Sequence, residues 1–165
     1  MESVCLILHI DPSTLSTAQQ KGERVVGGFV RHYIKPQVRK SQESIYDALI
    51  EAWTNAGREV FIGKTKNGRY RTMCRTPFTP KQPLELEIAY FFPYRSGTPK
   101  RITSRGVMLP MVERPDCDNL TKGLQDVLAD AGIIPDDAQV TRLVIDKKRW
   151  IEQYISVKIE RVCLG

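Results

Sequence analysis

The sequence lacks the features that mark several large classes of protein. No apolar stretch approaches the roughly 18 residues that a membrane-spanning helix requires. Residues 1–11 contain neither the basic segment nor the small-residue cleavage site of a secretory signal. The four cysteines form no C-x-x-C pair, and the two histidines are not spaced to complete a zinc site with them. These absences favour a reduced, cytoplasmic protein with no structural zinc and no disulfide framework.

The length and composition are those of one globular domain. The chain has 165 residues, of which 41% are hydrophobic. A chain of this size buries roughly 70% of the surface that it exposes when unfolded, which is enough for a core without disulfides. The sequence contains no internal repeat and no low-complexity tract. We therefore expect a single domain over residues 1–165.

Positive charge is in excess and is clustered. The formal charge is +6, and the stretch 95–105 contains basic residues but no acidic one. Two further basic clusters lie at 31–40 and 147–149. Clustered Lys and Arg suit a polyanionic partner, because they neutralise phosphates and release counterions. A solvated surface explains any one cluster equally well, so charge alone does not decide the function.

The first half of the chain gives weak structural signals. Residues 4–10 and 25–34 are rich in β-branched and apolar side chains, which predicts two strands. Residues 41–56 carry apolar side chains at helical spacing, and Gly57 is placed to end that helix. Residues 63–81 are rich in Gly, Lys, Arg, Thr and Pro, which predicts a loop or an irregular hairpin.

The second half is clearer. Residues 84–90 alternate between apolar and polar and then give way to Phe91-Phe92-Pro93, which predicts a strand that stops at the proline; a basic loop at 95–106 and a short strand at 107–112 follow. The clearest helix is predicted by one stripe of apolar residues within 120–131. Asp118 or Asn119 is its expected N-cap, and Gly132 is placed to end it. Two strands, from 140 and from 151, complete the chain. The predicted fold is α+β, a mixed β-sheet flanked by helices.

The helix and its flanks carry a group of charged residues. In an extended backbone Asp116 and Asp118 point to one face, and paired carboxylates are the hard oxygen ligands that Mg²⁺ requires. Asp136 and Asp137 follow the helix, and the return strand can carry them back toward Asp116. Lys122 lies one turn after Asp118, opposite the apolar stripe, so that its ammonium group can act beside the carboxylates.

Structural explanations exist for the same residues. An aspartate at a helix N-terminus, such as Asp118, is commonly only a cap, and an Asp-Asp pair beside a proline is an ordinary turn. A calcium-binding loop is excluded, because Leu120 and Thr121 stand where its third ligand and its glycine belong. A nucleotide transferase that uses the D-x-D pair for its metal remains an alternative, although the sequence has no glycine-rich phosphate loop.

The same region resembles the RusA-like Holliday junction resolvases of bacteria and their phages. The matching pattern is P-D-x-D-N-x-x-K from Pro115 to Lys122, followed by the helix and by D-D-x-Q-V from Asp136 to Val140. The interval from the first to the last aspartate, 137 − 116 = 21 positions, is also similar to the family's. With the strand and basic loop that precede the pattern, the resemblance is clearest over residues 84–160.

The resemblance implies a homodimeric, Mg²⁺-dependent endodeoxyribonuclease that cuts Holliday junctions and other branched DNA by paired symmetric nicks, in recombination and repair. Mn²⁺ is an alternative metal ion. By carry-over, Asp116, Asp118 and Asp137 would bind the metal ion, and Lys122 would complete the catalytic set. Such a protein acts in the cytoplasm of a bacterial or phage-infected cell. The residues expected to hold DNA phosphates are Arg95, Lys100, Arg101, Arg105 and Arg114.

Three departures from the family pattern qualify the resemblance. Residues 41–81 do not align with the family, and the chain is longer than a minimal member. Cys117 stands between the two aspartates where an aliphatic residue is usual, and on a strand it would point away from the metal ion as a small hydrophobe. An alternative to the nuclease is a non-catalytic protein that binds junctions and whose aspartates serve only as caps and turns.

Overall fold

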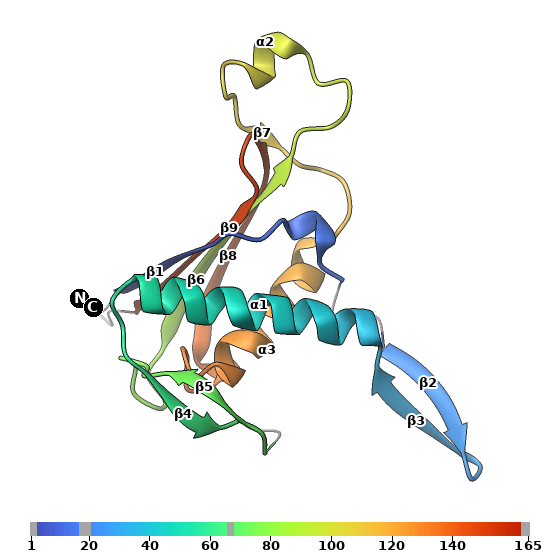
Figure 1. Ribbon diagram of the computed structural model, residues 1–165, viewed down its shortest axis with the longest axis vertical. Coiled ribbons are helices and arrows are strands. Elements are labelled where there is room, and N and C mark those ends of the chain that lie inside the picture. Colours follow the sequence, from blue (N-terminus) through green and yellow to red (C-terminus); the bar gives the residue numbers. More distant parts are fainter. Residues whose placement is uncertain (1–2, 17–20, 66–67, 163–165) are drawn as a thin grey trace.

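The centre of the structure is a five-stranded sheet with the strand order β1-β9-β6-β8-β7. In the computed structural model, which describes residues 3–16, 21–65 and 68–162, β6 pairs in parallel with β8 and antiparallel with β9. The remaining pairs, β1 with β9 and β7 with β8, are antiparallel, so the predicted mixed sheet is confirmed (Figure 1). The strands are β1 (Ser3–Leu8), β6 (Leu84–Pro93), β7 (Leu109–Pro110), β8 (Val140–Trp150) and β9 (Tyr154–Arg161).

Strand β6 lies in the middle of the sheet, and the face that it turns toward the helices is apolar. Its side chains from Leu84 to Tyr90 alternate between buried and half-buried positions, as the sequence pattern predicted, and Phe91 and Phe92 are buried as well. The half-buried Glu85 and Glu87 form ion pairs with neighbouring strands, through Arg142 and Lys158. Burying every second side chain fixes the register, since a one-residue slip would turn the apolar face to solvent.

Two long helices cover the sheet. Helix α1 (Pro36–Asn55) packs against β1 and against α3 (Cys117–Asp130), and α3 also contacts β8 (Figure 1). The side chains between the helices and the sheet form one buried cluster that includes Trp53, Leu124 and Leu128. Helix α1 begins earlier than predicted, because Pro36 occupies the first turn, where a proline costs no hydrogen bond. It ends before Gly57, which has the positive φ of 69° expected for a C-cap glycine.

The structure corrects the prediction of one strand over residues 25–34. Two strands, β2 (Lys21–Val26) and β3 (Phe29–Ile34), form a hairpin there. Gly27 and Gly28 join them with φ values of 60° and 82°, and a two-residue hairpin turn of type I′ requires positive φ at both positions.

The hairpin alternative for residues 63–81 is confirmed, because β4 (Val60–Lys64) and β5 (Tyr70–Cys74) pair antiparallel. The basic loop contains one short helix, α2 (Lys100–Thr103), and projects from the end of the sheet (Figure 1). Two 3-10 turns, η1 (Pro12–Thr14) and η2 (Asp137–Gln139), complete the described elements. Among the described residues no helix has the length and apolar character needed to cross a membrane.

The packing of α3 gives a test of the core. Leu128 is fully buried in α3, whereas Leu143 on β8 is 42% exposed. We expect Leu128→Ala to lower the free energy of unfolding by about 2–5 kcal/mol, because it removes buried methyl groups and leaves a cavity. Leu143→Ala is the matched control, with an expected change within about 0.5 kcal/mol. Urea denaturation measures both, and equal losses would contradict the placement of α3.

Candidate active site at the start of helix α3

Two cations of β8 hold the loop that leads into α3. The Lys147 Nζ donates hydrogen bonds of 2.7 Å to the backbone oxygens of Glu113 and Pro115. The Arg149 guanidinium donates to the Glu113 carboxylate at 3.1 Å and to the Pro93 backbone oxygen at 2.7 Å. The cluster at 147–149, which as a charge pattern was compatible with DNA binding, is therefore used in large part to fix the residues just before Asp116.

Glu113 is the acidic partner in this network. Its carboxylate accepts the hydrogen bond from Arg149 and forms a 2.9 Å ion pair with Arg95. The Arg149 hydrogen bond is the main reason that the pKa of Glu113 lies below its ordinary value, and the charge of Arg95 acts in the same direction. Arg95, which was expected to hold a DNA phosphate, thus pairs with a carboxylate in this structure.

The first aspartate pair lies on the first turn of α3, not on an extended strand. Asp116 is the N-cap, with φ −72° and ψ 149°, and Asp118 belongs to the first turn. The prediction of Asp118 or Asn119 as N-cap is therefore wrong by two or three residues, because the helix already begins at Cys117. Both carboxylates are exposed, and the Asp116 side chain makes no capping hydrogen bond. The positive end of the helix dipole stabilises both negative charges. The Asp116 carboxylate, which is not used for capping, stays available to a ligand.

Lys122 and Asp126 extend this charged face along α3. Lys122 is exposed, one turn after Asp118, as predicted, and the half-buried Asp126 follows one turn later. Cys117 is half-buried on the helix, so the expectation that it points away from a metal ion on a strand is replaced by a helical position. The buried Leu120 and Leu124 hold the opposite face of α3 against the core.

Buried polar atoms without a hydrogen-bond partner gather mainly at the start of α3. Within the described residues these atoms are Tyr90 Oη, Asn119 Oδ1, Thr121 Oγ1 and Gln139 Oε1. Burial raises the pKa of the Tyr90 hydroxyl, and the Thr121 side chain partly offsets this shift. Tyr90, Asn119 and Thr121 supply three of these atoms at the start of α3, and Gln139 supplies one at the second segment. Because such groups are rare in folded proteins, their number at the start of α3 singles out this end of the helix.

The second acidic segment is anchored at the other end of the sheet. Asp136 is the N-cap of η2, where its carboxylate accepts a 3.0 Å hydrogen bond from the Ala138 backbone nitrogen. The buried Gln139 donates from Nε2 to the backbone oxygens of Thr79 and Gln82, at 2.9 and 2.8 Å. Asp137, between them, is exposed. Asp136 is thus engaged as a cap, whereas Asp137 projects from a turn that Gln139 ties down.

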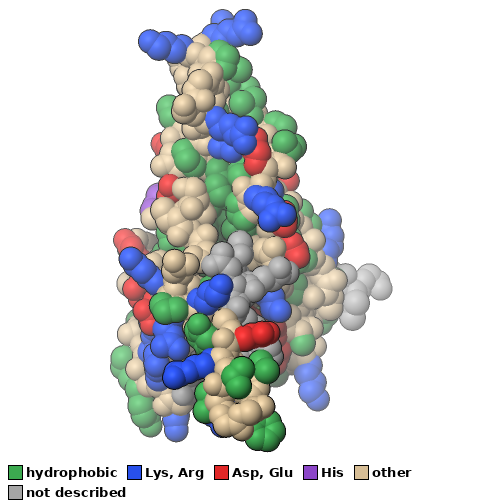
Figure 2. Space-filling view, turned by 90° about the vertical axis from the view of Figure 1, so that its right-hand side faces the viewer, with side chains coloured by type: hydrophobic (Ala, Val, Ile, Leu, Met, Phe, Trp, Pro, Cys, Tyr) green, Lys and Arg blue, Asp and Glu red, His purple; other side chains and the backbone are tan. Residues whose placement is uncertain are grey.

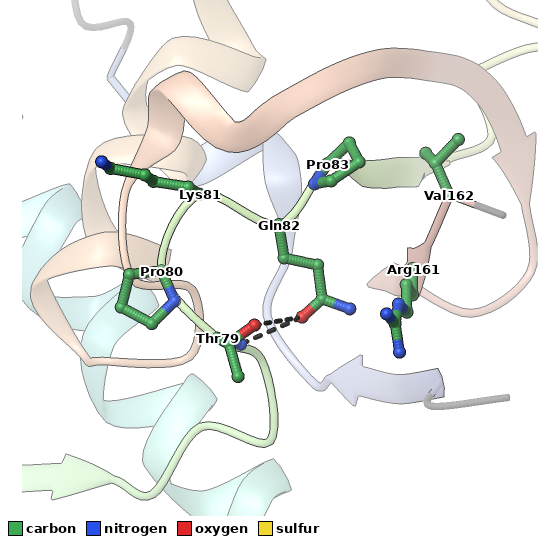
Figure 3. Close-up of a pocket in the computed structure, with 7 residues that line it drawn as sticks. All are labelled: Thr79, Pro80, Lys81, Gln82, Pro83, Arg161 and Val162. Atoms are coloured by element: carbon green, nitrogen blue, oxygen red, sulfur yellow. Dashed lines mark hydrogen bonds between the residues drawn. The ribbon is translucent and has the colours of Figure 1, made fainter. Parts of the chain in front are cut away.

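The loop that receives Gln139 is itself braced. The Gln82 Oε1 accepts hydrogen bonds from the backbone nitrogen and the hydroxyl of Thr79, at 3.0 and 3.2 Å (Figure 3). Pro80 and Pro83 limit the backbone freedom of the same loop, which lines a hollow with Arg161 and Val162 (Figure 3). Sequence reasoning missed this support for Asp137, although Gln139 stood within the quoted pattern and could have indicated it.

The two acidic segments do not meet within one chain. Helix α3 has 14 residues, and at a rise of 1.5 Å per residue its ends are about 20 Å apart. Strand β8 gives the same result, because Lys147 contacts the loop before Asp116 while Val140 adjoins η2, about 23 Å away along an extended strand. Within the described residues no three acidic, histidine or cysteine side chains form a group that could hold a metal ion. The expectation that the return strand carries Asp137 back to Asp116 is corrected: β8 begins at the far end of α3.

The expected DNA-binding cations lie along one projecting segment. Lys100, Arg101 and Arg105 are exposed on and beside α2, and Arg114 is exposed two residues before Asp116. Lys and Arg side chains occupy the tip of this projection (Figure 2). Their exposure leaves these four cations accessible to a phosphate backbone.

A comparison with known families decides the assignment. The sequence pattern of the family Endodeoxyribonuclease RusA matches residues 34–160, which include both acidic segments and the basic projection. The chain belongs to the RusA family. It is therefore related to nucleases that act on Holliday junctions, and the match extends through α1, which sequence reasoning could not align. No curated protein matches the sequence.

The hold of Lys147 on the loop gives the second test. We expect Lys147→Met to speed amide hydrogen exchange in residues 111–116, because hydrogen bonds from a charged donor to two backbone oxygens are lost, each worth about 1.5–3 kcal/mol. Lys148→Met is the matched control, since within the described residues the Lys148 side chain forms an ion pair with Asp146 and no hydrogen bond to this loop. Unchanged exchange in Lys147→Met would show that the loop is fixed by other contacts.

Proposed function

We propose that this RusA-family chain is a Mg²⁺-dependent endonuclease that resolves Holliday junctions and other branched DNA by paired symmetric nicks. The observation that carries the proposal is the exposed Asp116-x-Asp118 pair at the start of α3. Lys147 fixes the loop before this pair through its hydrogen bond to the Pro115 backbone oxygen. Such an enzyme would act in DNA recombination and repair, in the cytoplasm of a bacterial or phage-infected cell.

The carboxylates are the groups that would hold the metal ion. Asp116 and Asp118 offer exposed carboxylate oxygens at the start of α3, and Asp137 is better placed than the capping Asp136 to offer a third. Carboxylate oxygens are what Mg²⁺ takes in proteins, and Mn²⁺ shares this preference. When bound, such an ion polarises the scissile phosphate and lowers the pKa of a water molecule.

We further propose that the site is completed by a second copy of the chain. The length of α3 keeps Asp137 about 20 Å from Asp116 in one chain, so a set of three carboxylates needs a residue from another chain. A two-fold dimer in which each chain lends Asp137 to its partner contains two equivalent sites. Two equivalent sites account for the cutting of two strands at matching positions.

The cations have separate roles in this proposal. The Lys122 ammonium group, one turn from Asp118, stabilises negative charge that develops on the phosphate or the leaving oxygen. Lys100, Arg101, Arg105 and Arg114 bind phosphates and position the DNA without reading its sequence. Arg95 can join them only if a phosphate competes with Glu113 for its guanidinium group.

The alternative of a junction-binding protein without catalysis explains less. It would treat the aspartates as caps and turns, and Asp136 does act in this way. Asp116, however, occupies the N-cap position of α3 without a capping hydrogen bond. The exposed and unused carboxylate favours the nuclease.

Cleavage of a labelled four-way junction tests the proposal. We expect paired nicks in the junction with Mg²⁺, none with EDTA, and none in a linear duplex of the same sequence. Asp116→Asn should slow cutting at least about 100-fold while junction binding persists, because it removes a metal ligand but no DNA contact. Asp47→Asn, an exposed aspartate of α1, is the matched control and should cut like the unaltered protein. Normal cutting by Asp116→Asn would rule out the assigned site.

A further inference from the structure

The β2–β3 hairpin is an arm that projects from the body of the protein. It extends beyond the start of α1, away from the central sheet (Figure 1). Among the strands that the structure describes, β2 and β3 pair only with each other. Almost all of it, residues 21–33, precedes the range matched by the family pattern. An isolated two-stranded hairpin is at best marginally stable in water, so contacts within the arm must help to keep its two strands paired.

The hairpin is braced from within. The ring of Tyr33 lies across Gly22, where an added Cβ would come within 2.3 Å of the ring. The Gly27-Gly28 turn supplies the backbone geometry of a tight hairpin. An aromatic ring over a cross-strand glycine and a well-formed turn together hold the arm in shape without a covering surface.

The tip of the arm is apolar and open to solvent. Phe29 is 76% exposed, and the three valines around the turn, Val25, Val26 and Val30, are exposed as well. Hydrophobic side chains gather at the lower front of the molecule in the view that faces the arm (Figure 2). Val26 pairs with Phe29 across the strands, and Val25 pairs with Val30 on the opposite face, so both faces of the tip are apolar. Exposed apolar side chains grouped in this way mark an interaction site.

The middle of the arm, next to the apolar tip, is positively charged. Arg24 lies directly opposite Arg31 in the hairpin register, and like charges in that position destabilise a strand pair. Neither arginine forms an ion pair within the part of the chain that the structure describes. Glu23, the hairpin's acidic residue, is adjacent to Arg24 in sequence and so points to the other face. The exposed Arg39 and Lys40 of α1 continue the positive charge.

We propose that the β2–β3 hairpin is a wedge that enters branched DNA at the point where the strands separate. Phe29 and the valines meet bases that have lost a stacking partner, and Arg24 and Arg31 bind the phosphates that flank them. Apolar side chains inserted between bases, with basic side chains beside them, are a known means of opening DNA. A symmetric contact with a second copy is disfavoured, because it would bring two sets of opposed arginines together. This inference rests on the proposed function, since it takes branched DNA as the substrate.

Phe29→Ala tests the wedge, with Tyr70→Ala as the matched control. Tyr70 is 75% exposed on the separate β4–β5 hairpin, so the control removes an equally exposed aromatic ring elsewhere. The probe is a four-way junction with 2-aminopurine beside the branch point, whose emission rises when the base unstacks. We expect Phe29→Ala to bind the junction about 5- to 150-fold more weakly and to abolish the rise in emission, with duplex affinity unchanged. Arg24→Gln should lower the salt dependence of binding by about one counterion.

The outcomes separate this inference from the proposed nuclease. Junction affinity and emission at the unaltered level in Phe29→Ala would overturn the wedge, and continued cutting would leave the nuclease standing. Loss of the dimer in Phe29→Ala, seen by light scattering, would also overturn the wedge, because it would make the tip a subunit contact. Phe29-dependent opening of the junction by a protein that never cuts would support the wedge and overturn the nuclease.

Discussion

The length of α3 is the constraint on which the candidate site depends. The helix is a rigid spacer whose apolar face is buried against the sheet, so the acidic residues before it and after it cannot approach each other. Parallel pairing of β6 with β8 reinforces this separation, since it fixes where the strand that follows the helix must begin. Bending α3 would expose its buried leucines. Any site that needs both acidic segments must therefore be assembled from two chains.

Each end of this spacer is held by a long polar side chain that reaches backbone oxygens. At the start of α3, Lys147 binds the oxygens of Glu113 and Pro115; at the far end, Gln139 binds those of Thr79 and Gln82. Both anchors arise from β8 or from the turn just before it. A single strand thus positions the two acidic segments, and it leaves their carboxylates exposed to bind something outside the chain.

Much of the fold could be predicted from the sequence, where periodicity was strong. The alternation in β6 and the apolar stripe of α3 fixed their type and their buried faces, because burial on one side leaves a regular pattern. The β2–β3 turn was missed, since Gly27-Gly28 interrupts a run of β-branched residues that continues on both sides. The separation of Asp116 from Asp137 was missed because local spacing carries no information on where the return strand begins. The anchoring by Lys147 was missed for a related reason: a sequence does not show whether a lysine faces solvent or donates hydrogen bonds to the backbone of a nearby loop.

A mixed dimer tests whether the active site is shared between two chains. Differently tagged Asp116→Asn and Asp137→Asn chains are produced together, purified through both tags and given a labelled four-way junction with Mg²⁺. If each site takes Asp116 from one chain and Asp137 from the other, one site of the mixed dimer keeps both aspartates. We then expect single nicks by the mixed dimer and no cutting by either parent dimer. A mixed dimer as inactive as its parents would contradict an active site shared between two chains.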